Sequence, residues 1–328
     1  MIYEPEDKIF STEQVGFEHL ALEIFQFQYN NNAIYQQYVN AVSIVGPNVR
    51  SLQQIPFLPI QFFKTVSIKT TVFEPEAVFE SSGTTQTINS RHFVKDMGLY
   101  RQSFLTAFEL FYGPVQDWCM IALLPAYLER QNSSLVVMAD ELIKLSRHPD
   151  SGFYLYEYEK LAQVLQQLEA RKQKTLLIGV TFALLDFAEN HAMPLLHTVI
   201  METGGMKGRR KEMTREEVHE VLKAAFQLPA IHSEYGMTEL LSQAYSTGNG
   251  LFACPPWMKV LVRQEDDPLE VYTSGKGIIN IIDLANLYSC SFIATDDVGL
   301  VTPNGNFEVQ GRVDTSDIRG CNLLVAGW

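Results

Sequence analysis

Short apolar runs alternate with longer amphipathic segments through the middle of the chain, and this alternation restricts the fold more than any other feature. Apolar runs typical of buried strands lie at 117–125, 135–138, 175–180 and 197–201. Segments with helical periodicity lie at 91–111, 157–171, 182–190 and 215–226. Alternating strands and helices form crossover units, so the pattern predicts an α/β fold with a mainly parallel sheet flanked by helices.

The pattern changes after about Gly248, where the apolar runs become shorter and turn residues separate them. These runs, at 260–263, 277–283 and 307–310, predict a smaller β-rich subdomain. The 328 residues are long for one core and suit one large domain with subdomains, or two domains. We therefore predict an α/β core with an N-terminal helical segment at 1–247 and a β-rich subdomain at 248–328.

The composition narrows the classes of partner. The net charge of −13 disfavours nucleic acid and anionic lipid, although a local pocket can still bind a nucleotide. The longest apolar run, near 175–185, is too short to span a bilayer, and the N-terminus is acidic where a signal peptide would be basic. The four cysteines have no C-x-x-C spacing, so no zinc site is indicated. We expect a cytoplasmic protein.

A loop of small polar residues at 80–85 is the first candidate for chemistry. Hydroxyls and exposed backbone N–H groups bind phosphate oxygens, and glycine permits close approach. The loop is not a Walker loop, because no lysine completes a G-x-x-x-x-G-K frame. A solvated turn explains the loop equally well when it is taken alone. The candidate phosphate ligands are Ser81, Ser82, Gly83, Thr84 and Thr85.

The second candidate is the segment 232–239, His-Ser-Glu-Tyr-Gly-Met-Thr-Glu. Tyr235 offers a flat face for a base, Thr238 a hydroxyl for phosphate, and Glu239 a hard oxygen for Mg²⁺. Gly236 belongs to the same motif. The alternative is a strand-to-helix turn, whose acidic helix start the macrodipole alone would favour.

The third candidate is the segment 294–299, which carries the adjacent residues Asp296 and Asp297. Paired aspartates can bind the two ribose hydroxyls of a nucleotide, as an acidic residue does in dinucleotide sites. A β-turn is the better explanation of this segment when it is taken alone.

The fourth candidate is the segment 311–321, which combines two arginines, two aspartates and the thiol of Cys321. Arg312 lies at its start. Exposed salt bridges are the alternative explanation of its charges.

Taken together in this order, the four motifs resemble the adenylate-forming superfamily, which includes acyl-CoA synthetases, luciferase and peptide-synthetase adenylation domains. The resemblance extends from about Glu80 to the end of the chain, and 235–239 is its most specific part. It implies the large N-terminal domain of such an enzyme, with ATP and Mg²⁺ bound. The implied roles are Mg²⁺ binding by Glu239, adenine stacking by Tyr235, ribose binding by Asp297 with Arg312, and a base pocket lined by Gly204 and Gly205.

Two departures from the superfamily pattern narrow the resemblance. No lysine follows the threonines of the 80–85 loop, and the mobile C-terminal domain, with its catalytic lysine, is essentially absent. With these two losses the chain resembles the LuxE-type acyl-protein synthetases, which also lack both features. The segment 202–210 is similar to that branch as well. That resemblance implies activation of a fatty acid to acyl-AMP and its transfer to Cys321. It further implies an acyl reductase, or an acyl carrier, as partner.

The missing lysine leaves a gap in positive charge. Lys207 and Arg209 follow the Gly204-Gly205 turn and could supply it, although a solvated basic loop explains them equally well. Cys321 would react as the thiolate, and Arg319 beside it could lower its pKa from an ordinary value near ~8.5. The candidate catalytic residues are therefore Cys321, Glu239, Lys207 and Arg209.

Two other functions stay open at this point. One is a relative of phenylacetate-CoA ligase that passes its acyl group to coenzyme A or a carrier protein. The other is a module that binds a nucleotide without turnover, for which the missing C-terminal domain is the best support.

Overall fold

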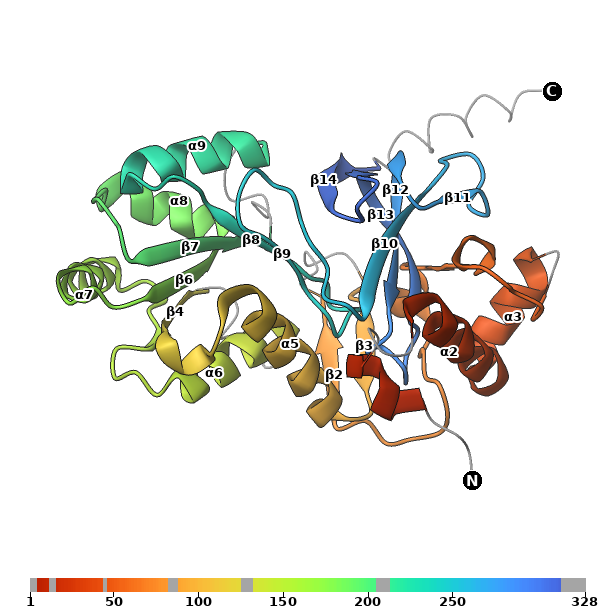
Figure 1. Ribbon diagram of the computed structural model, residues 1–328. Helices are drawn as coiled ribbons and strands as arrows, with labels where there is room; N and C mark the ends of the chain where they lie inside the picture. The colour runs from red at the N-terminus through yellow and green to blue at the C-terminus, as the bar shows by residue number, and fades with distance from the viewer. Residues whose placement is uncertain are drawn as a thin grey trace.

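The computed structural model describes residues 5–11, 16–43, 46–81, 88–124, 132–204 and 213–313. Within these ranges the chain forms two large sheets and one hairpin (Figure 1). The first large sheet has the strand order β5-β4-β6-β7-β8-β9. Its strands are β4 (Cys119–Leu123), β5 (Gly152–Phe153), β6 (Thr175–Val180), β7 (Thr198–Thr203), β8 (His232–Tyr235) and β9 (Ala244–Ser246).

This first sheet confirms the predicted α/β fold. All its neighbouring strands are parallel except β9, which runs antiparallel to β8. Its helices are α5 (Met97–Tyr112), α6 (Ser134–Ser146), α7 (Tyr158–Ala170), α8 (Thr181–Asn190) and α9 (Arg215–Phe226). Helices α8 and α9 lie on one face of the sheet, and α5 and α6 lie on the other (Figure 1). Strands β4 and β6 are buried at every position, because helices cover both faces.

The second large sheet is mostly antiparallel and, apart from β1, is built from the C-terminal part of the described chain. Its order is β1-β13-β12-β10-β11, and β14 pairs with β13. Only β1 pairs in parallel, with β13. The strands are β1 (Leu58–Pro59), β10 (Met258–Arg263), β11 (Val271–Tyr272), β12 (Gly275–Asp283), β13 (Phe292–Val301) and β14 (Phe307–Arg312).

The N-terminal helices lie beside this second sheet (Figure 1). They are η1 (Pro5–Ser11), α2 (Phe17–Asn31) and α3 (Ala33–Val42). The buried side chain of Gln28 joins α2 to the connection between β12 and β13, because its Nε2 donates to Leu287 O at 2.8 Å and its Oε1 accepts from Ser291 N at 3.0 Å. The domain boundary near residue 247 stays a prediction.

A small hairpin lies between the two large sheets in space (Figure 1), and in sequence it follows β1 and precedes β4. It consists of β2 (Ala77–Glu80) and β3 (Arg91–Val94), which pair antiparallel. The remaining elements are η2 (Leu52–Gln54), α4 (Phe62–Thr65) and η3 (Val115–Asp117).

Two local predictions were wrong, and two of the alternative explanations are excluded. The run 135–138 is not a strand but the start of α6, which buries one face through Met138 and Leu142. The segment 91–111 is not helical throughout, because Arg91–Val94 forms β3 before α5 begins. The segment 294–299 is no turn but part of β13, and 232–239 leads into β9 rather than into a helix.

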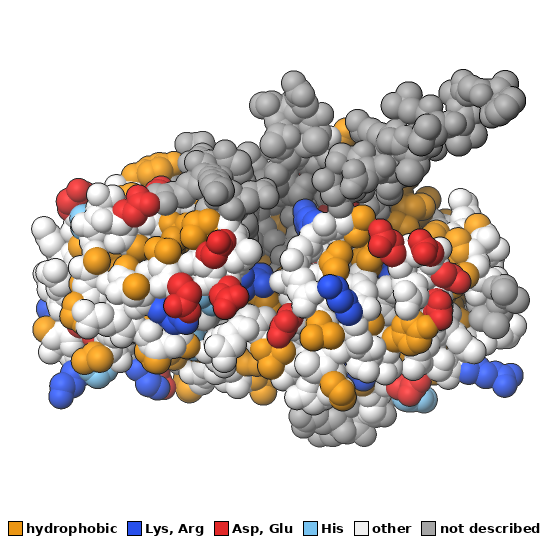
Figure 2. All heavy atoms as spheres, turned by 90° about the horizontal axis from the view of Figure 1, so that it is seen from above, with side chains coloured by type: hydrophobic (Ala, Val, Ile, Leu, Met, Phe, Trp, Pro, Cys, Tyr) orange, Lys and Arg blue, Asp and Glu red, His pale blue; other side chains and the backbone are white. Residues whose placement is uncertain are grey.

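The surface of the molecule agrees with the acidic composition. Acidic side chains form small groups on both halves of the face seen in Figure 2, with hydrophobic side chains scattered between them. In the part of the chain that the structure describes, none of the helices combines the length and the apolar character needed to cross a membrane.

Candidate active site

The predicted ribose and adenine ligands meet at the end of β8. The hydroxyl of Tyr235, the last residue of β8, donates to Asp297 Oδ2 at 2.7 Å. Arg312 Nε donates to Asp297 Oδ1 at 2.8 Å. Asp297 on β13 and Arg312 on β14 are direct partners in the antiparallel register, so the backbone itself sets this contact. Three predicted site residues are therefore in direct contact.

Tyr235 is held as a hydrogen-bond donor. Burial, followed by the negative charge of Asp297, raises the pKa of the Tyr235 phenol well above its ordinary value, so the hydroxyl keeps its proton. The Tyr235 ring packs against Phe307, with ring centroids 5.4 Å apart, and against Phe252 at 5.8 Å. These contacts fix the ring at the point where β8 approaches the second sheet.

The two adjacent aspartates do not act as a pair. Asp296 accepts hydrogen bonds from Gln61 Nε2 at 2.7 and 2.8 Å, whereas Asp297 contacts Tyr235 and Arg312. Successive side chains of a strand point to opposite faces, and both residues lie in β13. The geometry therefore leaves Asp297 alone beside Tyr235.

Glu239 lies next to the closed end of the β2–β3 hairpin. Ser81 and Ser90 close the hairpin, since Ser81 N donates to Ser90 O at 3.1 Å and Ser90 N donates to Ser81 Oγ at 2.9 Å. The side chain of Ser90 also interacts with the Glu239 carboxyl and acts to lower its pKa. Both Ser90 and Glu239 are buried. The two ends of the candidate phosphate loop are thus anchored beside the candidate metal ligand, while Ser82, Gly83, Thr84 and Thr85 lie outside the described residues.

The environment of Glu239 suits a divalent cation that also contacts phosphate. Burial raises the pKa of the Glu239 carboxyl, while the Ser90 side chain and the positive charges of Arg312 and Lys64 act in the opposite direction. Mg²⁺ in phosphate sites is commonly held by one or two carboxylates together with phosphate oxygens. A single buried carboxylate beside the loop, with the half-buried Thr238 next to it, fits that arrangement.

Gly204 lies next to Tyr235 at the carboxyl edge of the parallel sheet. The register of β7 with β8 pairs Thr203 with Glu234, so the following residues, Gly204 and Tyr235, are neighbours. Gly204 has a φ of +71°, which glycine adopts without strain, and its carbonyl accepts from Thr181 Oγ1 at 2.5 Å. The other predicted residues of this turn, Gly205, Lys207 and Arg209, lie outside the described residues.

Glu234 lies beside the candidate site, and the sequence interpretation missed it. Burial raises its pKa to about 7, and the Thr203 hydroxyl donates to its Oε2. Its Oε1 lies against Gly236, where an added Cβ would be 2.4 Å away. The available signal was an acidic residue at a buried position of a strand, directly before Tyr235.

His92 is the second residue that was missed. It occupies a buried position of β3 and contacts the carbonyl of Thr238 and the side chain of Asn286. Interpreting 91–111 as helical concealed this position, because the buried face of a strand follows a period of two rather than 3.6.

The described cysteines are poor nucleophiles. Burial raises the pKa of Cys119 to about 11 and the pKa values of Cys254 and Cys290 to about 12. Thiols with such pKa values carry little thiolate near neutral pH. Cys321 lies outside the described residues.

Comparisons with known proteins identify the family of this chain. The model of the family described as "Acyl-protein synthetase, LuxE" matches residues 6–327. The long-chain-fatty-acid–luciferin-component ligase of Aliivibrio fischeri is 23% identical over 349 residues, covering 98% of this chain and 91% of the relative. The protein of the same name from Vibrio harveyi is 24% identical, covering 92% and 85%.

Solved structures share the fold. A 2-hydroxyisobutyryl-CoA ligase superposes with a TM-score of 0.66 at 13% identity, covering 98% of this chain and 76% of that chain. ATP-bound MatB from Rhodopseudomonas palustris superposes with a TM-score of 0.54 at 15% identity, covering 74% of this chain, which spans only 50% of the length of MatB. These likenesses confirm the predicted fold of an adenylate-forming enzyme. Because the family model matches nearly the whole chain, the chain belongs to the LuxE family of acyl-protein synthetases and is a ligase.

Proposed function

We propose that this protein uses ATP to activate a fatty acid as acyl-AMP and then transfers the acyl group to the thiol of Cys321. The observation that carries the proposal is the contact of Tyr235, Asp297 and Arg312 beside a hairpin that is anchored to Glu239. The relatives' printed name, long-chain-fatty-acid–luciferin-component ligase, supports a fatty acid as the substrate. The likeness in fold to an ATP-bound ligase supports ATP.

The first step is adenylation. A carboxylate oxygen of the acid attacks the α-phosphorus of ATP, a P–O bond forms, and the bond to pyrophosphate breaks. Both reactants are anions, so the site must align them and offset their charge. Residues 81–85 would bind phosphate oxygens, Tyr235 and Gly204 would face adenine, and Asp297 with Arg312 would hold the ribose.

Positive charge at the site would come from two sources. Glu239 would hold Mg²⁺, whose charge neutralises the phosphates when it is bound. Lys207 and Arg209 follow the turn at Gly204, which lies beside Tyr235, and would add charge from within the large domain.

The second step is thioester formation. The thiolate of Cys321 attacks the acyl carbon of acyl-AMP, a C–S bond forms, and AMP leaves with the electrons of the acyl–oxygen bond. The high pKa values of Cys119, Cys254 and Cys290 support Cys321 as the acceptor. The thioester would then pass to a further acceptor, an acyl reductase or an acyl carrier.

Intact mass spectrometry after incubation with ATP, Mg²⁺ and mixed fatty acids tests the proposal. We expect an adduct with the mass of one acid minus water, removed by hydroxylamine. Cys321→Ser should lose the adduct and keep ATP–pyrophosphate exchange, whereas Cys254→Ser, the matched control, should keep both. An adduct that persists in Cys321→Ser would exclude that cysteine. Adduct-free protein that still acylates added coenzyme A would indicate a CoA ligase, and the absence of any exchange would indicate a nucleotide-binding module.

A further inference from the structure

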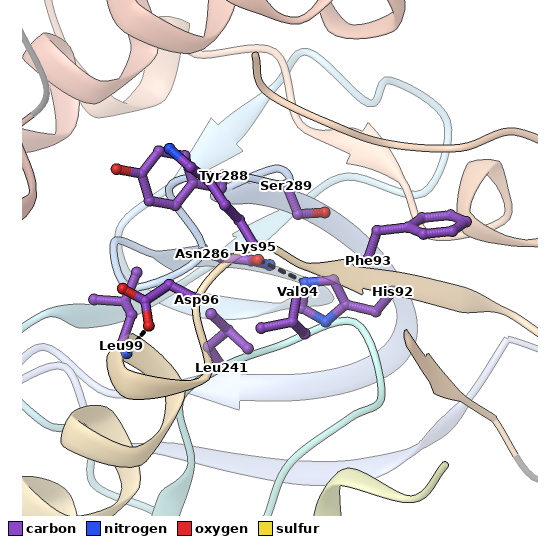
Figure 3. Close-up of a pocket in the computed structure, with 10 residues that line it drawn as sticks. All are labelled: His92, Phe93, Val94, Lys95, Asp96, Leu99, Leu241, Asn286, Tyr288 and Ser289. Atoms are coloured by element: carbon purple, nitrogen blue, oxygen red, sulfur yellow. Dashed lines mark hydrogen bonds between the residues drawn. The ribbon is translucent and has the colours of Figure 1, made fainter. Parts of the chain in front are cut away.

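His92 connects two segments that are far apart in sequence (Figure 3). Its Nδ1 lies 2.8 Å from Thr238 O, and its Nε2 lies 2.9 Å from Asn286 Oδ1. The Asn286 side chain continues the connection, because its Nδ2 donates to Glu239 O at 2.6 Å. The backbone of Thr238 and Glu239 is therefore held at two successive carbonyls.

The two polar contacts of His92 both need a donor on the ring. Thr238 O and Asn286 Oδ1 only accept, so Nδ1 must carry a proton to bond Thr238 and Nε2 must carry one to bond Asn286. Burial lowers the pKa of His92 to about 4, although its contacts with Thr238 and Asn286 act in the opposite direction. The ring is therefore neutral near pH 7 and has one N–H, so it can donate to Thr238 O or to Asn286 Oδ1 but not to both.

The surroundings leave the ring little freedom. His92 is 1% exposed, and the rings of Phe63 and Phe79 pack against it with centroids 6.1 and 6.5 Å away. A small pocket beside it is lined in part by the charged residues Lys95 and Asp96, which directly follow β3 (Figure 3). Aromatic packing thus aims Nδ1 at Thr238.

We propose that His92 is a positioning residue for adenylation, which fixes Thr238 and Glu239 against the hairpin that carries the phosphate loop. His92 follows Ser90 by two residues on the same hairpin; Ser90 interacts with the carboxyl of Glu239, and His92 contacts the backbone carbonyl of Thr238 beside it. The hairpin therefore contacts the 235–239 motif at the Glu239 side chain and at the Thr238 backbone. The proposal rests on the proposed function, because it assigns His92 to that same site.

Three substitutions separate the two ring nitrogens. In His92→Asn the side-chain amide can take the place of Nδ1–H, whereas in His92→Gln it reaches the place of Nε2; His92→Ala removes both. We expect His92→Asn to keep kcat for ATP–pyrophosphate exchange within about threefold of the wild-type value. We expect His92→Gln and His92→Ala to lose kcat roughly 10–100-fold, because small displacements of reacting groups cost that much. The matched control is His19→Asn, at an exposed histidine.

The outcomes distinguish positioning from stability alone. If His92 only stabilises the fold, His92→Ala lowers the melting temperature and keeps the wild-type kcat and KM for ATP, which overturns the proposal. Should His92→Ala not fold, Asn286→Asp replaces it, since a carboxylate cannot donate to Glu239 O. We expect the same loss of kcat, and a wild-type kcat overturns the proposal.

A measurement on the wild-type protein is independent of catalysis. We expect ¹⁵N spectra of labelled histidine, with the His92 signals assigned by their loss in His92→Asn, to show a protonated Nδ1 and an unprotonated Nε2. A protonated Nε2 with a bare Nδ1 overturns the proposal. If the wild-type protein shows no ATP–pyrophosphate exchange but has the expected tautomer, the proposed function fails. The contact of His92 with the backbone of Thr238 then still stands.

Discussion

Asp297 is the side chain on which nucleotide binding should depend most directly. Both of its oxygens already accept hydrogen bonds, one from Tyr235 and one from Arg312. Each carboxylate oxygen has a second lone pair, so two ribose hydroxyls can still donate to it. The neighbouring groups hold the carboxylate in place before the ligand arrives.

We predict that Asp297→Asn raises the KM for ATP in pyrophosphate exchange by about tenfold and changes kcat much less. The amide must present an N–H₂ group to either Tyr235 or Arg312, and hydrogen bonds to a charged group contribute roughly 1.5–3 kcal/mol. The matched control is Asp296→Asn, which makes the same change on the opposite face of β13 beside Gln61. Equal effects of the two substitutions would contradict the assignment of Asp297 to the site.

Among the secondary-structure elements, those with strong periodicity were predictable and those made by distant pairing were not. The strands β4, β6 and β7 and the helices α7 to α9 follow from local apolar patterns, because burial on one face or both leaves a clear signature. The short strand β3 was missed because its partner β2 and the loop at Asn286 determine its conformation. The same explanation applies to the candidate site. Tyr235, Asp297 and Arg312 belong to motifs that are visible in the sequence. His92 belongs to no motif, because its role depends on contact with Asn286, 194 residues away.

The turn after β8 depends on a glycine for reasons of space. An added Cβ at Gly236 would lie 2.4 Å from Glu234 Oε1 and 3.4 Å from Gln243 Cγ. The Glu234 carboxyl cannot move freely, because it is buried and the Thr203 hydroxyl donates to its other oxygen.

We therefore predict that Gly236→Ala lowers the free energy of unfolding by about 1–3 kcal/mol. In the Glu234→Ala background the same change should cost less, because only the 3.4 Å contact with Gln243 remains. Urea unfolding of the two single variants and the double variant measures this coupling. The control is Gly152→Ala, where an added Cβ meets nothing within 4 Å. Additive effects in the cycle would show that Gly236 is required for another reason.

At the scale of the whole molecule, Arg215 joins the two large sheets next to the site. It begins α9, and its Nε donates to Glu202 Oε1 at 3.0 Å at the end of β7. Its Nη1 donates to Val309 O at 3.0 Å on β14. The guanidinium also lies over the ring of Phe252, 5.0 Å from its centre. One side chain thus links the strand before Gly204 to the strand that carries Arg312.

The pKa of Glu202 gives this link a pH dependence. Burial by itself would raise that pKa, but the side chain of His219, whose Nε2 lies 3.7 Å from Glu202 Oε1, and the charge of Arg215 together bring it below the ordinary value of 4.5. A carboxyl with a depressed pKa in the folded state stabilises the protein above its unfolded pKa, and this contribution is lost as the pH falls through the folded pKa.

We predict that Arg215→Ala lowers the free energy of unfolding at pH 7 by about 3–5 kcal/mol, because it leaves the buried Glu202 carboxylate without its cation. The loss should shrink as the pH falls below 4.5, where protonation removes the buried charge. Glu202→Gln combined with Arg215→Ala should cost less at pH 7 than Arg215→Ala alone. Arg101→Ala is the control, because its ion pair with Glu141 is half exposed and should contribute less than ~1 kcal/mol. Denaturant unfolding at pH 7 and pH 4 measures the free energy of unfolding of the wild-type protein and of the three variants. A loss for Arg215→Ala that is independent of pH would mean that the contacts with Val309 and Phe252, rather than the charge on Glu202, hold the two sheets together.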